Sequence, residues 1–146
     1  MNENDSILGF MGHDHDRLDE IFTEFKKLKQ NDLDKAKQYF QEFKEGLERH
    51  IIWEEDILFP HFDKKNGFHN TGPTMVMKQE HIEIKKNLYK IQDLLDHNNI
   101  KTEDYEKQMF SILKMHNDKE ESILYPAIDK ISSTNQVRSF IDQMKN

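Results

Sequence analysis

The sequence contains no cysteine among its 146 residues. This absence excludes disulfide bonds, a thiol nucleophile and iron–sulfur ligation by the chain itself. Glycine and proline are also scarce, with five and three residues respectively, so the chain has few of the turn signals that strands require. Any chemistry must therefore come from His, Glu, Asp or Tyr, and the composition favours an all-helical fold.

Long hydrophobic runs are missing as well. No apolar stretch approaches membrane-spanning length, and the opening segment lacks the basic start and apolar run of a secretory signal. We therefore expect no membrane partner and a cytoplasmic location. The 28 acidic residues outnumber the 21 basic ones, which gives a formal net charge of -7, and the basic residues are scattered rather than clustered. Nucleic acid and anionic surfaces are accordingly poor candidate partners.

The sequence does contain an internal repeat with an offset of 66 residues. The stretch HIIWEEDILFP at residues 50–60 returns as HNDKEESILYP at residues 116–126, and the apolar positions around it repeat with it. The length of the chain suits one domain with a core of its own. We interpret residues 1–146 as a single domain made of two similar segments, roughly 8–64 and 74–130.

Apolar residues recur at steps of three and four along four stretches, which is the spacing of a helix with one inward face. The pattern breaks where Asn, Asp, Gly and Pro gather, near residues 31–32, 66–73 and 98–99. Two further prolines, Pro60 and Pro126, are expected to end or kink their helices. The pattern predicts an up-down-up-down four-helix bundle built from two helical hairpins, with a short C-terminal helix over TNQVRSFIDQMKN.

Six titratable side chains lie on the inward stripes, among apolar neighbours. They are His15, His50, Glu54, His81, His116 and Glu120. Burying an unpaired carboxylate costs several kcal/mol, against a total stability of about 5 to 15 kcal/mol for a small domain. A bound cation would satisfy carboxylates and neutral imidazoles together. Because residues i and i+4 share a helix face, two of the stripes can each supply a histidine and a glutamate, and the other two stripes one histidine each.

Six ligands in two equal sets predict two metal ions rather than one. Glu54 and Glu120 are the natural bridges, so that each ion takes two imidazoles and shares two carboxylates. Mixed imidazole and carboxylate ligation with open positions favours iron over manganese or zinc. Two alternatives stay open: a metal-free bundle in which these side chains form buried ion pairs, and a single-metal or zinc site of the same geometry.

Carboxylates flank the six candidate ligands in the sequence. Asp14 and Glu80 immediately precede ligand histidines, and we hypothesise that they accept the outer N–H of an imidazole on a neighbouring helix and so fix its tautomer. Glu55 and Glu121 lie next to the ligand glutamates, but helical geometry turns them about 100° away from the ligand line. The Phe and Tyr residues are interpreted as packing.

These motifs resemble the hemerythrin-like, or HHE cation-binding, domain family. The resemblance covers almost the whole chain and rests on DHDRL, HIIWEEDILFP, QEHIEI and HNDKEESILYP. It implies the four-helix bundle and a metal site at the six residues named above. The stretch GPTMVMKQEH at residues 72–81 is also similar to the corresponding part of the di-iron proteins that repair iron–sulfur clusters after nitrosative or oxidative stress.

Two departures from the family pattern bear on function. Lys85 stands where oxygen-carrying hemerythrins have a further histidine, and Glu120 and Glu121 stand where those proteins place a single aspartate five residues after the last histidine. Both departures argue against reversible oxygen carriage. The cluster-repair proteins usually carry a further histidine after the first helix and a cysteine-containing N-terminal domain, and the stretch FKKLKQNDLDKAKQ supplies neither.

The leading expectation is a non-haem di-iron protein that binds or reacts with dioxygen, peroxide or nitric oxide, in an oxidative or nitrosative stress role or in iron–sulfur repair. Its electrons would come from an external donor, which the sequence does not name. The alternative is an iron-binding module for storage, delivery or sensing, without turnover. A third reading is a protein-interaction bundle whose zinc is purely structural.

Overall fold

The computed structural model describes residues 5–146. Within that range the chain is helical and contains no strand, which confirms the all-helical prediction. The helices are α1 (Ile7–Leu28), α2 (Leu33–Ile52), α3 (Phe59–Asn66), α4 (Pro73–Asp96), α5 (Glu103–Lys119), α6 (Tyr125–Lys130) and α7 (Thr134–Lys145). Two π-helical segments, η2 (Trp53–Leu58) and η3 (Glu120–Leu124), join α2 to α3 and α5 to α6. None of the described helices is long and apolar enough to cross a membrane.

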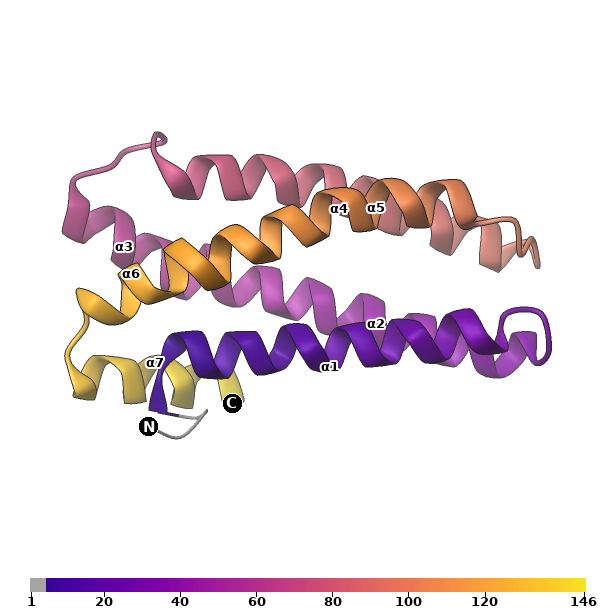
Figure 1. The fold of residues 1–146 in the computed structure, drawn as a ribbon, viewed down its shortest axis with the longest axis horizontal. Helices are drawn as coiled ribbons and strands as arrows, with labels where there is room; N and C mark the ends of the chain where they lie inside the picture. The colour runs from indigo at the N-terminus through magenta and orange to yellow at the C-terminus, as the bar shows by residue number, and fades with distance from the viewer. Residues whose placement is uncertain (1–4) are drawn as a thin grey trace.

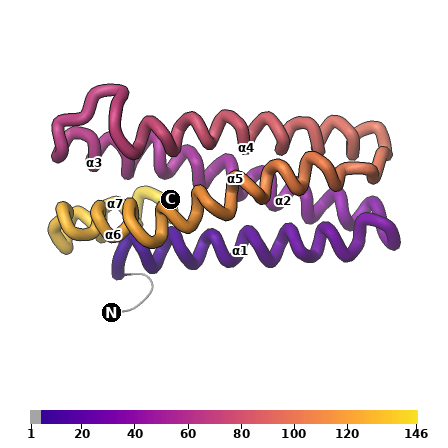
Figure 2. Tube along the Cα trace, turned by 45° about the horizontal axis from the view of Figure 1, so that its top comes forward, coloured from indigo at the N-terminus to yellow at the C-terminus, as the bar shows by residue number. Residues whose placement is uncertain are grey.

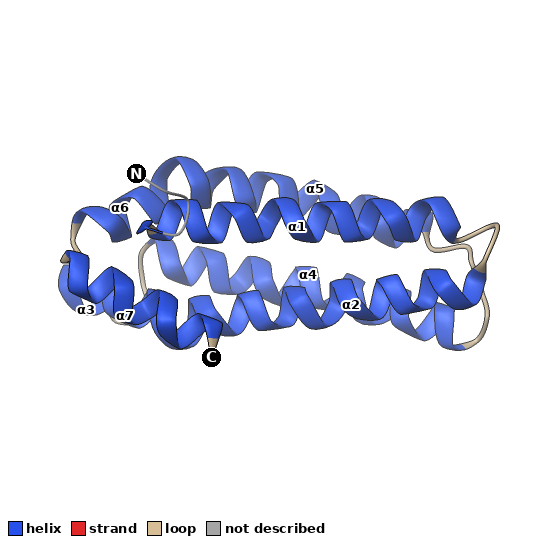
Figure 3. Cartoon of the chain, turned by 90° about the horizontal axis from the view of Figure 1, so that it is seen from below, coloured by secondary structure: helices blue, strands red, loops and turns tan. Residues whose placement is uncertain are grey.

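The long helical segments are α1, α2 with η2, α4, and α5 with η3, and they run along the long axis of the molecule (Figure 1). Helix α1 packs against α2, and α4 packs against α5, each pair joined by a short loop at the same end. Contacts of α2 with α4 and of α1 with α6 hold the two pairs together (Figure 3). The short helices α3, α6 and α7 gather at the opposite end, beside the start of α1 (Figure 2). The four long segments thus enclose an interior that extends between the two ends of the molecule.

Local sequence explains where several helices begin and end. Ser6 precedes α1, and its hydroxyl accepts a hydrogen bond from the backbone N–H of Gly9. Ser133 and Gln136 form a capping box at the start of α7, the C-terminal helix that the sequence indicated. Helix α3 ends at Gly67, whose φ of +71° lies in the left-handed region that glycine adopts without strain.

The apolar core falls into two clusters with a layer of buried polar side chains between them. The larger cluster fills the end nearest the α1–α2 and α4–α5 loops and includes Leu18, Phe22, Phe25, Phe40, Phe43, Leu47, Ile84, Leu88, Ile91, Met109 and Leu113. The other lies under α3, α6 and α7 and includes Met11, Leu58, Phe59, Phe62, Met77, Leu124, Tyr125, Ile128, Val137 and Ile141. On α1, His15 lies between Met11 of one cluster and Leu18 of the other.

The two π-helical segments mark the places where the second and fourth long segments pass through this polar layer. The backbone N–H of Phe59 bonds to the carbonyl of Glu54, and the N–H of Tyr125 bonds to the carbonyl of Glu120, five residues before it in each case. A proline follows each segment, in the first turn of the next helix. A proline ring clashes with the carbonyl four residues before it, and the wider π turn gives that carbonyl room. The helices therefore do not end at Pro60 and Pro126.

At the loop end, a buried lysine joins the two helix pairs. The ammonium of Lys29 donates to Thr102 Oγ1 at 2.9 Å, to Glu103 Oε1 at 3.0 Å and to Glu106 Oε2 at 2.7 Å. Thr102 holds the N-cap position of α5, but its hydroxyl donates to Glu106 instead of capping the helix. This network links α1 to α5 at a distance from the polar layer.

Candidate metal centre

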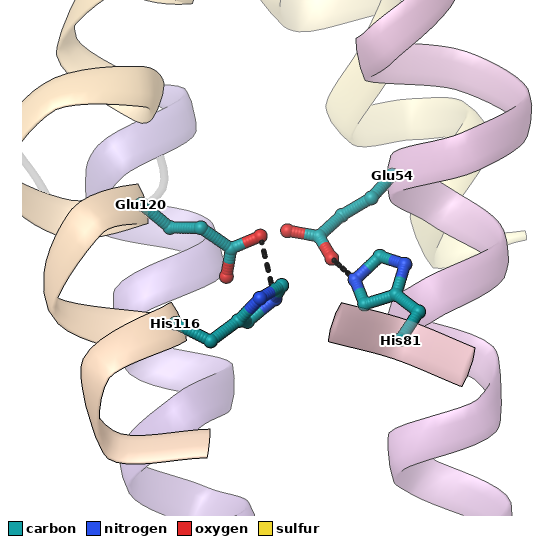
Figure 4. Close-up of side chains that lie close together, drawn as sticks. All are labelled: Glu54, His81, His116 and Glu120. Carbon is teal, nitrogen blue, oxygen red and sulfur yellow. Dashed lines mark hydrogen bonds and ion pairs between the residues drawn. The ribbon is translucent and has the colours of Figure 1, made fainter. Parts of the chain in front are cut away.

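All six side chains that the sequence singled out as ligands are buried, and they converge from α1, α2 with η2, α4, and α5 with η3. Their ligand-type atoms form two groups, and within each group these atoms lie within 4.8 Å of one another. Figure 4 shows the larger group, in which two carboxylates face each other and the two imidazoles lie on one side of them. The larger group is Glu54, His81, His116 and Glu120, and the smaller is His15, His50 and Glu120.

The four histidines fall into two pairs. His15 of α1 and His50 of α2 have ring centroids 4.6 Å apart, and this pair is named the α1/α2 half-site. His81 of α4 and His116 of α5 have ring centroids 4.8 Å apart and form the α4/α5 half-site. The second pair follows the first at the offset of 66 residues, so each copy of the repeat supplies one half-site.

Two glutamates stand between the half-sites. Glu54 places Oε1 3.0 Å from His81 Nε2 and Oε2 3.8 Å from His50 Nε2. Glu120 places Oε1 3.3 Å from His15 Nε2 in the α1/α2 half-site and Oε2 3.2 Å from His116 Nε2 in the α4/α5 half-site. Each carboxylate therefore directs one oxygen toward each pair of imidazoles.

Asp14 and Glu80 lie against the outer faces of imidazoles on neighbouring helices. His50 Nδ1 is 2.8 Å from Asp14 Oδ2, and His116 Nδ1 is 2.9 Å from Glu80 Oε1. Since a carboxylate accepts, each Nδ1 carries the hydrogen, and the remaining Nε2 of a neutral ring then faces inward without a proton. These are the contacts hypothesised from the sequence, and they hold both rings with Nε2 toward the centre of the layer.

Glu55 and Glu121 make the equivalent contacts with the other two histidines. His81 Nδ1 is 2.6 Å from Glu55 Oε2, and His15 Nδ1 is 2.9 Å from Glu121 Oε2. Helical periodicity placed these glutamates away from the ligand line, and no contact with the imidazoles was predicted for them. Because each side chain is turned away from the line of candidate ligands, it reaches the outer Nδ1 of an imidazole on an adjacent helix. The sequence feature that could have indicated this role is the position of both residues directly after a candidate ligand glutamate in each copy of the repeat.

Cationic side chains hold two of the outer carboxylates in place. Arg17 Nε donates to Asp14 Oδ1 at 2.9 Å, and Lys119 Nζ donates to Glu80 Oε2 at 2.5 Å. Burial raises the pKa of the Asp14 carboxyl, but the contacts with His50 and Arg17 outweigh burial and lower that pKa. Lys119 and His116 lower the pKa of Glu80 in the same way. Both carboxylates are therefore kept charged.

A tyrosine reaches the centre of the polar layer. The hydroxyl of Tyr125 lies 2.6 Å from Glu54 Oε2 and 3.0 Å from Glu120 Oε1. It also lies 3.1 Å from His50 Nε2 and 3.3 Å from His15 Nε2. The ring of Tyr125 packs in the apolar cluster under α7, as expected of a packing residue, but the position of its hydroxyl was not predicted from the sequence.

The π turn explains how Tyr125 comes to face the site. Five residues along an α-helix end about 140° round from the starting direction, which would turn Tyr125 away from Glu120. In η3 the backbone bonds from residue 125 to residue 120, so residues five apart lie one above the other. Helical periodicity of 3.6 residues per turn therefore could not place this side chain.

Without metal, protons balance the charge of the layer. Burial lowers the pKa of His15, but the Glu120 carboxylate beside it outweighs burial and raises the pKa to about 9. The same balance raises the pKa of His116 to about 9. Burial and the neighbouring charge of Glu120 raise the pKa of Glu54, whereas the nearby Glu54, His116 and His15 lower the pKa of Glu120 against the effect of burial.

The donor set suits a cation better than hydrogen bonds alone. Once the imidazoles have lost these protons, the inward-facing atoms are all acceptors, and the single hydrogen of the Tyr125 hydroxyl faces four of them. Glu120 Oε2 is buried and accepts no hydrogen bond of good geometry, although His116 Nε2 lies 3.2 Å away. Buried acceptors without donors are costly, and a bound cation removes that cost. The residues present therefore fit a metal ion.

A model of the hemerythrin HHE cation binding domain matches residues 6–145 of the chain. The chain belongs to this family. The resemblance inferred from the sequence motifs is thereby confirmed, and with it a cation-binding class of function. The His and Glu cluster is compatible with that class, because its donors are those that transition metals take in proteins.

Two curated proteins are similar to the chain. A DNA nickase of Nostoc sp. is 28% identical over 132 residues, which cover 90% of this chain and 36% of the nickase. An uncharacterized hemerythrin-like protein of Schizosaccharomyces pombe is 29% identical over 117 residues, which cover 80% of this chain and 56% of that protein. The match thus spans about a third of one relative and about half of the other. No solved structure is significantly similar.

Proposed function

We propose that this chain is a cytoplasmic non-haem di-iron protein that binds or reacts with dioxygen, peroxide or nitric oxide, in an oxidative or nitrosative stress role or in iron–sulfur repair. The observation that carries the proposal is the buried layer in which Glu54 and Glu120 each present one oxygen to both half-sites. The packing of the long helices supports an up-down-up-down four-helix bundle, and we treat residues 1–146 as one domain of this type.

We infer that each half-site holds one ion and that the two glutamates are shared between them. Two imidazoles with shared carboxylates form a ligand set that iron takes readily, with manganese or zinc as the alternatives. When bound, iron supplies one-electron redox chemistry and open coordination positions for a small ligand. The four outer carboxylates hold the imidazoles in the tautomer that leaves Nε2 free for ligation.

The surroundings of the layer control what reaches it. Apolar clusters on both sides exclude bulk water. A cavity of about 500 Å³ between α1 and α5 reaches His15 and Glu121 and has an apolar wall of Phe22, Phe110 and Leu113. Its other lining residues are polar or charged, and the cavity supports approach of a small molecule to His15 from between α1 and α5.

The partners we propose are small molecules and an external electron donor. The Nostoc relative is described as a DNA nickase, but the match spans 36% of that protein. We do not extend its activity to this chain, because a net charge of -7 and scattered basic residues disfavour binding to a nucleic-acid backbone. We likewise propose no membrane partner.

Turnover by the iron-loaded protein tests this function. Protein reconstituted with ferrous iron under anaerobic conditions is expected to consume peroxide or nitric oxide repeatedly when a reductant is supplied. The matched control is Glu120→Gln, which removes the charge shared by the half-sites with little change in size. Equal consumption by the variant, or none by either protein, would contradict the proposal.

The competing function is iron storage, delivery or sensing without turnover. Complete burial of both glutamates is compatible with it, because a buried centre also retains metal. Iron uptake that follows iron supply, with one slow oxidation and no repeated consumption of peroxide or nitric oxide, would favour this module over the di-iron enzyme.

A further inference from the structure

The candidate ligands of the two half-sites recur at matching positions of the repeat, but the buried residue five positions after each glutamate differs. Tyr125 follows Glu120 by five residues, at the junction of η3 and α6. Phe59 follows Glu54 by five residues, at the junction of η2 and α3. Both side chains are fully buried, and both come directly after a π turn. The repeat therefore brings a hydroxyl to one side of the centre and a phenyl ring to the other.

The hydroxyl faces the ligand atoms of the α1/α2 half-site. It lies within 3.3 Å of Nε2 on both imidazoles of that half-site. The carboxylate oxygens it contacts are Glu54 Oε2 and Glu120 Oε1, the same two oxygens that point toward that half-site. The hydroxyl of Tyr125 thus stands among the atoms that a metal ion would use there.

The α4/α5 half-site has different surroundings. The ring of Phe59 lies against that of His81, with centroids 6.0 Å apart and planes 6° from parallel, and offers no hydrogen bond. Four ligand atoms gather here within 4.8 Å of one another. Glu120 Oε2 points into this group and accepts no hydrogen bond of good geometry. An ion entering here displaces no hydroxyl.

We propose that metal ions load in a fixed order, the α4/α5 half-site before the α1/α2 half-site, and that Tyr125 sets this order. The inference rests on the proposed function in that both half-sites bind metal. The second ion must separate the hydroxyl from two carboxylate oxygens and two imidazole nitrogens. Tyr125 is a positioning residue, because it acts on the ligands through hydrogen bonds and is not itself a ligand.

The expected size of the effect follows from the strength of the contact that is lost. A hydrogen bond to a charged group changes an equilibrium by about ten- to a hundredfold. The contact from the hydroxyl to the Glu120 carboxylate, at 3.0 Å, is of this kind. We therefore expect the dissociation constant of the second ion to exceed that of the first by about ten- to a hundredfold.

Titration of the metal-free protein with Zn²⁺, followed by NMR of the histidine ring signals, tests the order. Zn²⁺ is diamagnetic and redox-inactive, so the result does not depend on gas chemistry. In the unchanged protein the signals of His81 and His116 are expected to shift during the first equivalent, and those of His15 and His50 during the second.

Three variants identify the cause. Tyr125→Phe is expected to tighten the second step by about ten- to a hundredfold, so that the two steps merge. The exchange variant, Phe59→Tyr with Tyr125→Phe, moves the hydroxyl to the other copy of the repeat and is expected to reverse the order. Phe59→Tyr alone leaves Tyr125 in place and is expected to weaken the first step about tenfold, which keeps the test open if Tyr125→Phe does not fold.

Several results would overturn the inference. The first is loading of the α1/α2 half-site before the α4/α5 half-site in the unchanged protein. The second is that Tyr125→Phe leaves the affinities of both binding steps unchanged. The third is that Tyr125→Phe weakens the second binding step, which would make the phenol a ligand. Ordered loading of Zn²⁺, together with no reaction of the iron-loaded protein with peroxide or nitric oxide, would retain this inference and overturn the proposed function. Zn²⁺ loading without a fixed order, together with repeated consumption of peroxide or nitric oxide by the iron-loaded protein, would overturn this inference and retain the proposed function.

Discussion

In the α1/α2 half-site the imidazoles face the hydroxyl of Tyr125, whereas in the α4/α5 half-site His81 lies against the ring of Phe59. The candidate ligands, the outer carboxylates and the π turns all recur in both copies of the repeat. The copies share the candidate ligands and their outer carboxylates and differ in a neighbouring group. Duplication of the candidate ligands therefore does not give the two half-sites equivalent surroundings, and substitutions can separate the features they share from those they do not.

Removing a carboxylate that serves both half-sites should have the largest effect. A bound transition metal contributes of the order of 10 to 16 kcal/mol through about four ligands, so loss of one charged ligand in Glu120→Gln is expected to weaken both ions by about a thousandfold. Metal content after dialysis measures this loss. Glu121→Gln is the matched control, since Glu121 contacts the outer nitrogen of His15 and its loss should affect the α1/α2 half-site. A Glu120→Gln protein that keeps its full metal content would refute the shared role.

The metal-free protein should become less stable as the pH rises, with equal contributions from the two half-sites. His15 in one and His116 in the other have pKa values raised from 6.5 to about 9. Their stabilisation is complete below about pH 6.5 and is lost as the pH rises through about 9, a change of the order of a few kcal/mol. Denaturant unfolding between these pH values measures it. Metal-loaded protein should not show this loss, because ligation keeps the nitrogens unprotonated; metal-free protein of constant stability would argue against the assignment.

Changes to the outer carboxylates should separate the half-sites. Asp14→Asn removes the charge behind His50 and should weaken the ion of the α1/α2 half-site, while Glu80→Gln removes the charge behind His116 and should weaken the other ion. Such outer partners are worth about 10- to 100-fold in metal affinity. Asp14 should show the larger effect, because its side chain is 9% exposed against 24% for Glu80. Stepwise Zn²⁺ titration measures both, and equal weakening of both ions by either variant would show that the half-sites are not independent.

The smallest effects are expected from the cations behind those carboxylates. Arg17 and Lys119 have side chains that are 34% and 39% exposed. Ion pairs of this exposure are worth about 0 to 1 kcal/mol, so Arg17→Gln and Lys119→Gln should change metal affinity by less than about fivefold. The same titration applies. A loss of more than tenfold would mean that these cations position the imidazoles more strongly than their exposure suggests.

Much of the fold could be predicted because the helices follow simple periodic rules. Steps of three and four residues marked the inward faces, and clusters of Asn, Gly and Pro marked the loops. The convergence of the six candidate ligands on one layer followed from the same rule combined with the 66-residue offset, whereas the pairing of the histidines did not. Each of these inferences needed a regular helix and nothing more.

The remaining features depend on departures from a regular helix or on contacts between helices. Tyr125 faces the site because a π turn precedes it, and no helical wheel of 3.6 residues per turn reproduces that direction. Glu55 and Glu121 reach imidazoles on neighbouring helices, which depends on packing rather than on periodicity. For the π turns, the signal in the sequence was a proline six residues after each candidate ligand glutamate, because in a regular α-helix its ring would clash with the carbonyl four residues before it.

The iron content of protein purified without oxygen, measured together with its absorption spectrum on addition of dioxygen, tests the central claim most directly. The claim is that two half-sites share Glu54 and Glu120. It predicts about two irons per chain and new absorption bands that Glu120→Gln abolishes. One metal ion per chain, or zinc without a spectral change, would contradict it.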